Sequence, residues 1–176
     1  MQKKKRDDHA GPNLRIFAFA FFILHSSCGE LDRVKLTIAW IGKAKEPSIA
    51  ALTAEYAKRI GRYCATDTFE SRDENALLER AAKDRATLVL LDARGKQMSS
   101  EELASFVGKH QDSGTQRLMF AIGPADGWSE AARAKAAVTL SLGKMTLAHE
   151  LARVVLLEQV YRAWTILKGH PYHTGH

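Results

Sequence analysis

Three short segments of this chain place glycine and polar residues directly after apolar runs. They are Leu91-Asp92 with the following Arg94-Gly95, residues 123–127, and residues 142–147. In parallel α/β sheets, ligands bind beyond the carboxyl ends of the strands, so these segments could line one pocket. Their backbone amides and carbonyls, with few charged side chains, suit a neutral or cationic adenosine ligand better than a polyphosphate.

The same segments exclude two common nucleotide motifs. No GxxxxGK[ST] sequence occurs, and no GxGxxG follows a predicted strand. The pattern therefore supports neither a P-loop nor a Rossmann dinucleotide site. Taken singly, each glycine turn is also what an ordinary connection between a strand and a helix looks like.

The chain end carries a second group of chemically capable residues. His170, Tyr172 and His173 follow a long apolar helix that bears Arg153 and Arg162. A tail His or Tyr could stack on an extruded base or move a proton, and the arginines could contact phosphate or base. The alternative for the arginines is a solvated ion-pair face with Glu150 and Glu158. No second cluster completes four ligands, so the tail does not predict a metal site.

Short apolar runs alternate with helical segments from Val34 onward, which predicts an α/β fold with a mostly parallel sheet. A capping box at Ser99 and Glu102 marks one helix start, and His149 opens the last and longest helix. Its apolar stripe is broad enough to predict packing on the sheet and on a second subunit. The expected strands are residues 35–41, 66–70, 87–91, 117–122 and 138–142, and the expected helices are residues 47–60, 75–83, 100–107, 129–137 and 149–167.

Bulk composition is that of an ordinary globular protein, with 45% hydrophobic and 26% charged residues among 176. The formal net charge of +6 is compatible with a nucleic-acid partner but does not require one. The two cysteines, Cys28 and Cys64, have no metal or disulfide spacing, which favours a reduced, cytoplasmic setting.

Residues 1–33 differ in kind from the rest. A basic cluster precedes an apolar run too short to span a bilayer, as in a signal peptide. We favour another interpretation: Val34 opens a complete domain, and valine is what a GUG start codon encodes when it does not initiate. Residues 1–33 are then expected to be a non-native, disordered extension, and residues 34–176 the functional domain. A secreted or lipid-anchored protein is the alternative that these residues leave open.

Four segments together resemble the ribosomal large subunit methyltransferase H family of the SPOUT superfamily. They are LVLLDARGKQMSSEELA, FAIGPADG, LSLGKMTLAHELARVVLLEQVYRAW and HPYH, and the opening VKLTIAWIGKAKEP agrees as well. The resemblance covers residues 34–173. It implies a SPOUT-type α/β fold with a deep C-terminal trefoil knot, an exception to the general absence of knots.

The resemblance also implies an activity. Family members are homodimeric, cytoplasmic enzymes that use S-adenosyl-L-methionine to methylate N3 of a pseudouridine in 23S rRNA, acting on the assembled 70S ribosome. No membrane or metal partner is expected. Carried over by motif, the cofactor pocket is lined by Leu91, Gly123, Leu142, Gly143, Lys144, Met145, Thr146 and Leu147.

The target side of the site falls on the last helix and the tail. The resemblance implies that Tyr172, His173 and Arg153 act in catalysis and that Arg162 and His170 contact the rRNA, across the dimer interface. Pro124 stands where a second glycine is commonest in the family, and Ala148 where a proline is usual. The remaining alternatives are a SPOUT enzyme with another RNA target and a ribosome-binding factor without catalysis.

Overall fold

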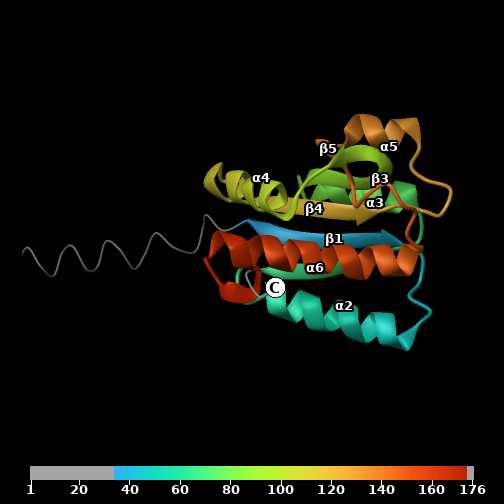
Figure 1. The fold of residues 1–176 in the computed structure, drawn as a ribbon. Helices are drawn as coiled ribbons and strands as arrows, with labels where there is room; N and C mark the ends of the chain where they lie inside the picture. The colour runs from blue at the N-terminus through green and yellow to red at the C-terminus, as the bar shows by residue number, and fades with distance from the viewer. Residues whose placement is uncertain (1–33, 174–176) are drawn as a thin grey trace, which may run out of the picture. The chain divides into compact units, whose positions relative to one another are not determined.

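Five parallel strands form the central sheet of the computed structural model, which describes residues 34–173. Their order is β2-β1-β4-β3-β5, and every neighbouring pair is parallel. The predicted fold class, a parallel sheet flanked by helices, is confirmed (Figure 1). The strands are β1 (Lys35–Ile41), β2 (Thr66–Ser71), β3 (Thr87–Gln97), β4 (Arg117–Ile122) and β5 (Val138–Ser141).

Side chains of the central strands alternate between two cores. In β4, Leu118 and Phe120 belong to one buried cluster, whereas Met119 and Ala121 belong to the other. All four are fully buried. This two-residue period explains why the central strands are continuous apolar runs: a parallel sheet covered on both faces has no polar side.

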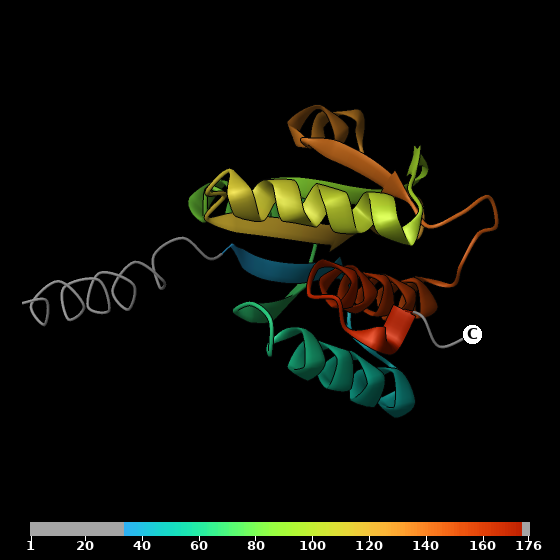
Figure 2. The same ribbon diagram turned by 60° about the vertical axis from the view of Figure 1, so that its left-hand side comes forward.

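Helices cover both faces of the sheet. Helices α2, α4 and α6 contribute to the cluster around Phe120, and α3 and α5 contribute to the cluster around Met119. Figure 2 shows α4, α6 and α2 side by side over their face. The helices are α2 (Pro47–Ile60), α3 (Glu74–Lys83), α4 (Ser100–Asp112), α5 (Glu130–Lys135) and α6 (His149–Leu167), and a 3₁₀ turn, η1 (Pro171–His173), follows.

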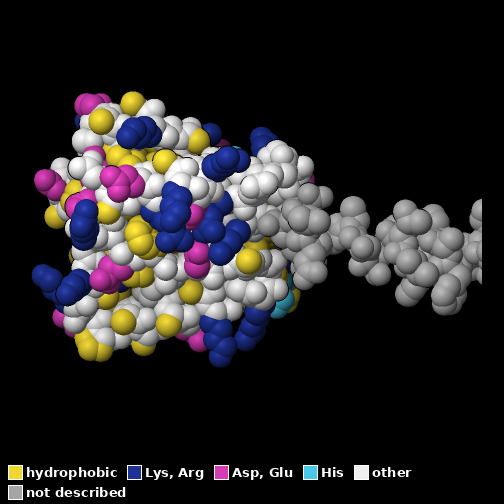
Figure 3. All heavy atoms as spheres, turned by 180° about the vertical axis from the view of Figure 1, so that it is seen from behind, with side chains coloured by type: hydrophobic (Ala, Val, Ile, Leu, Met, Phe, Trp, Pro, Cys, Tyr) yellow, Lys and Arg dark blue, Asp and Glu magenta, His cyan; other side chains and the backbone are white. Residues whose placement is uncertain are grey.

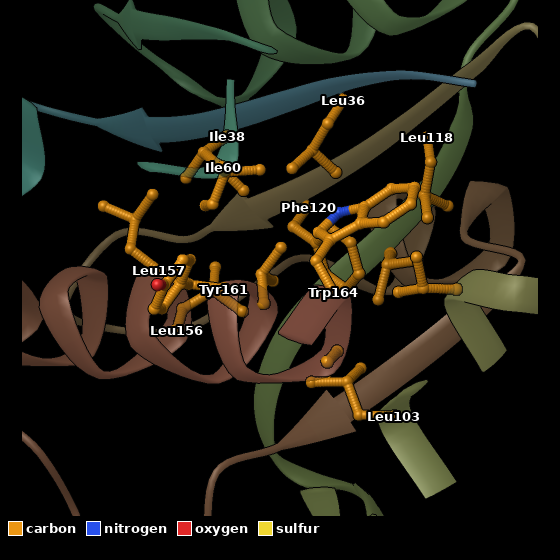
Figure 4. Packing of buried hydrophobic residues seen from close by; sticks show 14 of the residues in the cluster. Leu36, Ile38, Ile60, Leu103, Leu118, Phe120, Leu156, Leu157, Tyr161 and Trp164 are labelled. Carbon is orange, nitrogen blue, oxygen red and sulfur yellow. The ribbon is translucent and has the colours of Figure 1, made fainter. Parts of the chain in front are cut away.

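Helix α6 lies between α4 and α2 and packs on the sheet beneath them. Its Leu156, Leu157 and Trp164 are at most 1% exposed and join strand residues in one cluster (Figure 4). Much of the apolar stripe is thus buried within one chain, while Leu151 of the same helix is 51% exposed. Packing of the remaining part on a second subunit stays a prediction.

Strand β3 continues past the predicted end at Leu91. Residues 92–97 are polar, yet Lys96 pairs with Leu140 of β5, which also pairs with Leu91. The chain therefore bends around Leu140 between these two contacts. Gly95 lies at the crossing, where an added Cβ would stand 2.7 Å from backbone atoms of Leu140 and Thr139.

The last helix ends in a Schellman motif that sets the direction of the tail. Gly169 adopts a φ of 63°, and its amide donates to the Ile166 carbonyl. The His170 amide donates to the Thr165 carbonyl, the second bond of the motif. The tail after the motif makes the 3₁₀ turn η1. The predictions for residues 1–33 lie outside the described residues.

Candidate active site

A cavity of about 670 Å³ opens at the carboxyl ends of β4 and β5, beside residues 91–94 of β3, at the end to which the strand arrows point in Figure 1. Residues 91–94 of β3, the loops after β4 and β5, and the first turn of α6 line it. Its volume is in the usual range for a cofactor-sized ligand. The three segments singled out from the sequence therefore do meet in one place.

Seven of the eight residues predicted to bind cofactor line this cavity. Lys144 is the exception: it is exposed between two lining residues and is not part of the wall. Met145 is 84% exposed, so the loop after β5 forms an outer rim of the cavity. The seven lining residues are Leu91, Gly123, Leu142, Gly143, Met145, Thr146 and Leu147.

Trp128 fixes two of the three loops to each other. Its indole Nε1 donates a 2.8 Å hydrogen bond to the Leu91 carbonyl, and the ring is 4% exposed. The ring also lies against Gly123, where an added Cβ would stand 2.7 Å from Cε2. Sequence reasoning missed Trp128, although a tryptophan five residues after a strand-terminal glycine was the available signal.

An ion pair forms part of the cavity wall. Arg133 Nε donates to Asp92 Oδ2 at 2.8 Å, and the Arg94 amide donates to Oδ1 at 2.9 Å. Burial alone would raise the pKa of Asp92, but these two donors hold it below its ordinary value. The wall therefore presents a neutralised pair to a ligand.

His149, the first residue of α6, lines the same cavity. Its Nε2 is buried without a hydrogen-bond partner. Burial lowers the pKa of His149 and the positive charge of Arg153 lowers it further, against a hydrogen bond to the Gly123 backbone and the charge of Glu150.

Arg153 is fully buried one helical turn after His149. Its guanidinium lies 4.0 Å from the centroid of the Trp40 ring, and none of its three nitrogens has a hydrogen-bond partner. Burial lowers its pKa, opposed by the charges of Glu150 and Glu70. Arg153 does not line the cavity, so this geometry favours a role behind the wall over direct contact with RNA.

The tail residues lie away from the cavity of their own chain. Tyr172 packs edge-on against Tyr161 at 4.8 Å between centroids, and its hydroxyl donates to Glu158 Oε1 at 3.3 Å. Both partners are on α6, at least nine residues after His149. His170 is exposed, and its Nδ1 accepts from the Tyr172 amide. His173 closes the turn, and its side chain is outside what the structure describes.

Burial raises the pKa of Tyr172 to about 12, with Tyr56 and Glu158 adding to the shift. The phenol is therefore un-ionised at neutral pH and is not a base in this position. Arg162 donates to Glu158 at 2.6 Å and lies 5.2 Å from the Tyr172 ring centroid. Arg162 thus forms an ion pair with Glu158, although the pair is partly buried and not a solvated face. Contact of Arg162 with rRNA stays a prediction.

Charges of both signs intermix on the side of the molecule turned away in Figure 1. Figure 3 shows Lys and Arg side chains there with Asp and Glu side chains between them. Within residues 34–173, no group of three or more His, Cys, Asp or Glu is placed to hold a metal ion. No helix in that part of the chain is long and apolar enough to cross a membrane.

Comparison with known proteins agrees with this geometry. A family model described as "Predicted SPOUT methyltransferase" matches residues 34–173. "Ribosomal RNA large subunit methyltransferase H" of Koribacter versatilis is 58% identical over 146 residues, which cover 81% of this chain and 100% of the relative. The protein of the same name from Geotalea daltonii is 46% identical over 152 residues, covering 80% of this chain and 99% of its own.

A solved structure gives a looser match. The SpoU methyltransferase AviRb from Streptomyces viridochromogenes, in complex with AdoMet, is 16% identical with a TM-score of 0.43. The alignment covers 79% of this chain and 60% of the AviRb chain. The family model and the curated relatives extend over nearly every described residue. The chain therefore belongs to the SPOUT methyltransferase family.

Proposed function

We propose that this protein transfers a methyl group from S-adenosyl-L-methionine to N3 of a pseudouridine in 23S rRNA of the assembled 70S ribosome. The observation that carries the proposal is the cavity of about 670 Å³ at three strand ends, in a chain of the SPOUT family. The names of the relatives that match over 99–100% of their length point to ribosomal RNA as the substrate. We assign the protein to the cytoplasm, where ribosomes are.

The cavity suits this cofactor in size and chemistry. Its walls are mainly backbone and apolar side chains, and its one buried carboxylate, that of Asp92, is paired with Arg133. Bound S-adenosyl-L-methionine would supply the electrophilic methyl group. The backbones of Leu91, Gly123 and residues 142–147 would hold it, and positioning would provide much of the rate.

A homodimer is part of the proposal. Tyr172 is held against the middle of α6, while the cavity opens at the first turn of that helix. In a dimer, the tail of one chain can reach the cavity of the other chain. Its tail residues Tyr172, His173 and His170 would then lie at that cavity. Leu151 on α6 is 51% exposed and Leu52 on α2 is 44% exposed, as residues awaiting a partner surface would be.

We include the deep C-terminal trefoil knot in the proposal. Its support is the tight crossing of residues 92–97 over β5, where the chain bends around Leu140 and only a glycine fits. Such a crossing close to the chain end is what a threaded C-terminal segment requires.

Transfer of labelled methyl groups tests the function. Ribosomes from a strain without this gene are offered as 70S particles, with separate subunits and free rRNA in parallel. We expect label on 70S particles, mapped to N3 of a pseudouridine. Label on another RNA only would indicate a different SPOUT substrate. No label on any of these RNAs, with cofactor binding intact in calorimetry, would also indicate a different RNA target. No label and no cofactor binding would favour a ribosome-binding factor without catalysis.

Replacing Tyr172 by phenylalanine should change the rate of methyl transfer by less than about threefold, because one partly exposed hydrogen bond contributes little. The acidic limb of the pH–rate profile should be unchanged, because the pKa of the Tyr172 phenol is about 12. Tyr172→Ala should lower the rate of methyl transfer further, because it also removes the packing of the ring on Tyr161. Single-turnover transfer on 70S particles measures both.

Tyr63→Phe is the matched control, since Tyr63 also packs beside Tyr161 but is not in the tail. Loss of transfer in Tyr172→Phe alone would show that the phenol acts directly in the reaction. Equal rates of methyl transfer for Tyr172→Ala and the unmodified protein would show that Tyr172 is not part of the active site.

A further inference from the structure

Aspartate and arginine side chains line the cavity in two different settings. Asp92 and Arg133 are 8% and 20% exposed and bond to each other at 2.8 Å, and Arg133 also donates to Glu130 at 2.7 Å. Their charges are therefore neutralised before any ligand arrives. Arg94 and Asp126 line the same cavity but are exposed. The charges that remain available to a ligand on this wall are those of Arg94 and Asp126.

The Arg94 guanidinium is only weakly held by the protein. Its Nε lies 3.6 Å from Asp92 Oδ1, beyond hydrogen-bond distance, and the side chain is 69% exposed. Both oxygens of Asp92 already accept shorter bonds, Oδ2 from Arg133 and Oδ1 from the Arg94 backbone amide. The guanidinium donors of Arg94 are therefore available to an anionic group in the cavity.

Asp126 lies in the tight turn that follows β4. The Gly127 amide donates to the Pro124 carbonyl at 3.0 Å, which closes the turn and places Asp126 at its third position. Within residues 34–173, the Asp126 carboxylate has no hydrogen-bond donor and no ion-pair partner. Arg94 and Asp126 thus share one wall without neutralising each other.

The two segments that carry these charges are fixed to each other. Arg94 belongs to β3, and Asp126 belongs to the loop that continues into Trp128. The Trp128 indole donates to the Leu91 carbonyl of β3 at 2.8 Å, so it joins this loop to the strand. The backbones that carry the two charged side chains are therefore held in place before a ligand binds, which lowers the cost of binding.

We propose that Arg94 and Asp126 bind the α-amino-acid end of the cofactor, Arg94 at its carboxylate and Asp126 at its ammonium group. The inference rests on the proposed function, which supplies a ligand with such an end. A zwitterion carries one charge of each sign a few bonds apart, so it matches a wall with one available cation and one available anion. A phosphate-bearing ligand would satisfy Arg94 but would be repelled by Asp126.

Calorimetric titration of the full-length protein with three ligands tests the proposal. S-adenosylhomocysteine has both charged groups, its decarboxylated form keeps only the ammonium group, and methylthioadenosine has neither. Arg94→Gln should weaken binding of S-adenosylhomocysteine about tenfold and leave the affinities for the other two ligands within about twofold. Asp126→Asn should weaken binding of the first two ligands about three- to tenfold, and not that of methylthioadenosine.

Lys96→Gln is the matched control, because Lys96 is an exposed cation on the same strand as Arg94 but does not line the cavity. It should change the affinity for S-adenosylhomocysteine by less than about twofold. A loss equal to that of Arg94→Gln would overturn the proposal, since the general charge of the surface would then explain both. Arg94→Lys should retain more affinity than Arg94→Gln, because it keeps the positive charge.

The pattern across the ligands separates a direct contact from a change in the fold. Equal losses for all three ligands in Arg94→Gln or Asp126→Asn, or no loss for any, would overturn the proposal. In the unmodified protein, affinity should be highest for S-adenosylhomocysteine and lowest for methylthioadenosine, and equal affinities would also overturn it. Failure of the unmodified protein to bind any of the three would instead contradict the proposed function.

Discussion

Gly95→Ala is expected to lower the free energy of unfolding by about 3 kcal/mol or more, or to prevent native folding. The new Cβ would stand 2.7 Å from the Leu140 nitrogen, the Leu140 carbonyl carbon and the Thr139 carbonyl carbon. These are backbone atoms of a paired strand, so neither partner can move aside as a flexible side chain would. Guanidinium denaturation, with the recovery of soluble protein, measures the effect.

Gly114→Ala separates this crossing from a general cost of replacing glycine. Gly114 has a φ of 69°, and nothing lies within 4 Å of its added Cβ. Its substitution should cost about 1 kcal/mol, from backbone conformation alone. Equal denaturation midpoints for the two variants would contradict the close crossing at Gly95.

Gly123→Ala is expected to weaken S-adenosylhomocysteine binding by about 10- to 100-fold, equivalent to about 1–3 kcal/mol. Its Cβ would lie 2.7 Å from Cε2 and 2.9 Å from Nε1 of Trp128. Moving that ring breaks its hydrogen bond to the Leu91 carbonyl and displaces two walls of the cavity together. Calorimetric titration gives the dissociation constant.

Trp128→Leu provides the internal test of this explanation. Alone it should weaken binding by removing the hydrogen bond to Leu91. Combined with Gly123→Ala it should relieve the clash, so the double variant should bind better than the sum of the single effects predicts. Strict additivity would mean that Gly123 and Trp128 do not act on binding through their contact.

The sheet, its parallel strands and most of the cavity wall were readable in the sequence because each leaves a local pattern. Apolar runs marked β3 and β4, and glycine turns after them marked the loops that line the cavity. The extension of β3 left no such pattern. Residues 92–97 are polar and read as a loop, yet they pair with β5 because the crossing brings Leu140 to them.

Arg153 shows a different limit of sequence reasoning. An arginine on a helix is expected at the surface, because burying an unpaired charge is costly. Here the side chain is enclosed against the face of Trp40, a residue more than a hundred positions earlier. This contact depends on how α6 packs beside β1. The spacing of residues within α6 therefore cannot predict it. Lys144 is the opposite case, a motif residue that faces solvent beside a cavity it does not line.

The three loops around the cavity differ in their freedom to move, which bears on how a ligand gets in. The second half of β3, residues 92–97, bends around Leu140, and the loop after β4 is held by the Trp128 indole. The loop after β5 has an open Gly143, with nothing within 4 Å of an added Cβ, and an exposed Met145. Residues 143–148 have neither of these two restraints, and they lead directly into His149. A ligand that closes this loop would order the chain immediately before the first turn of α6, so binding and the placement of that helix end are coupled.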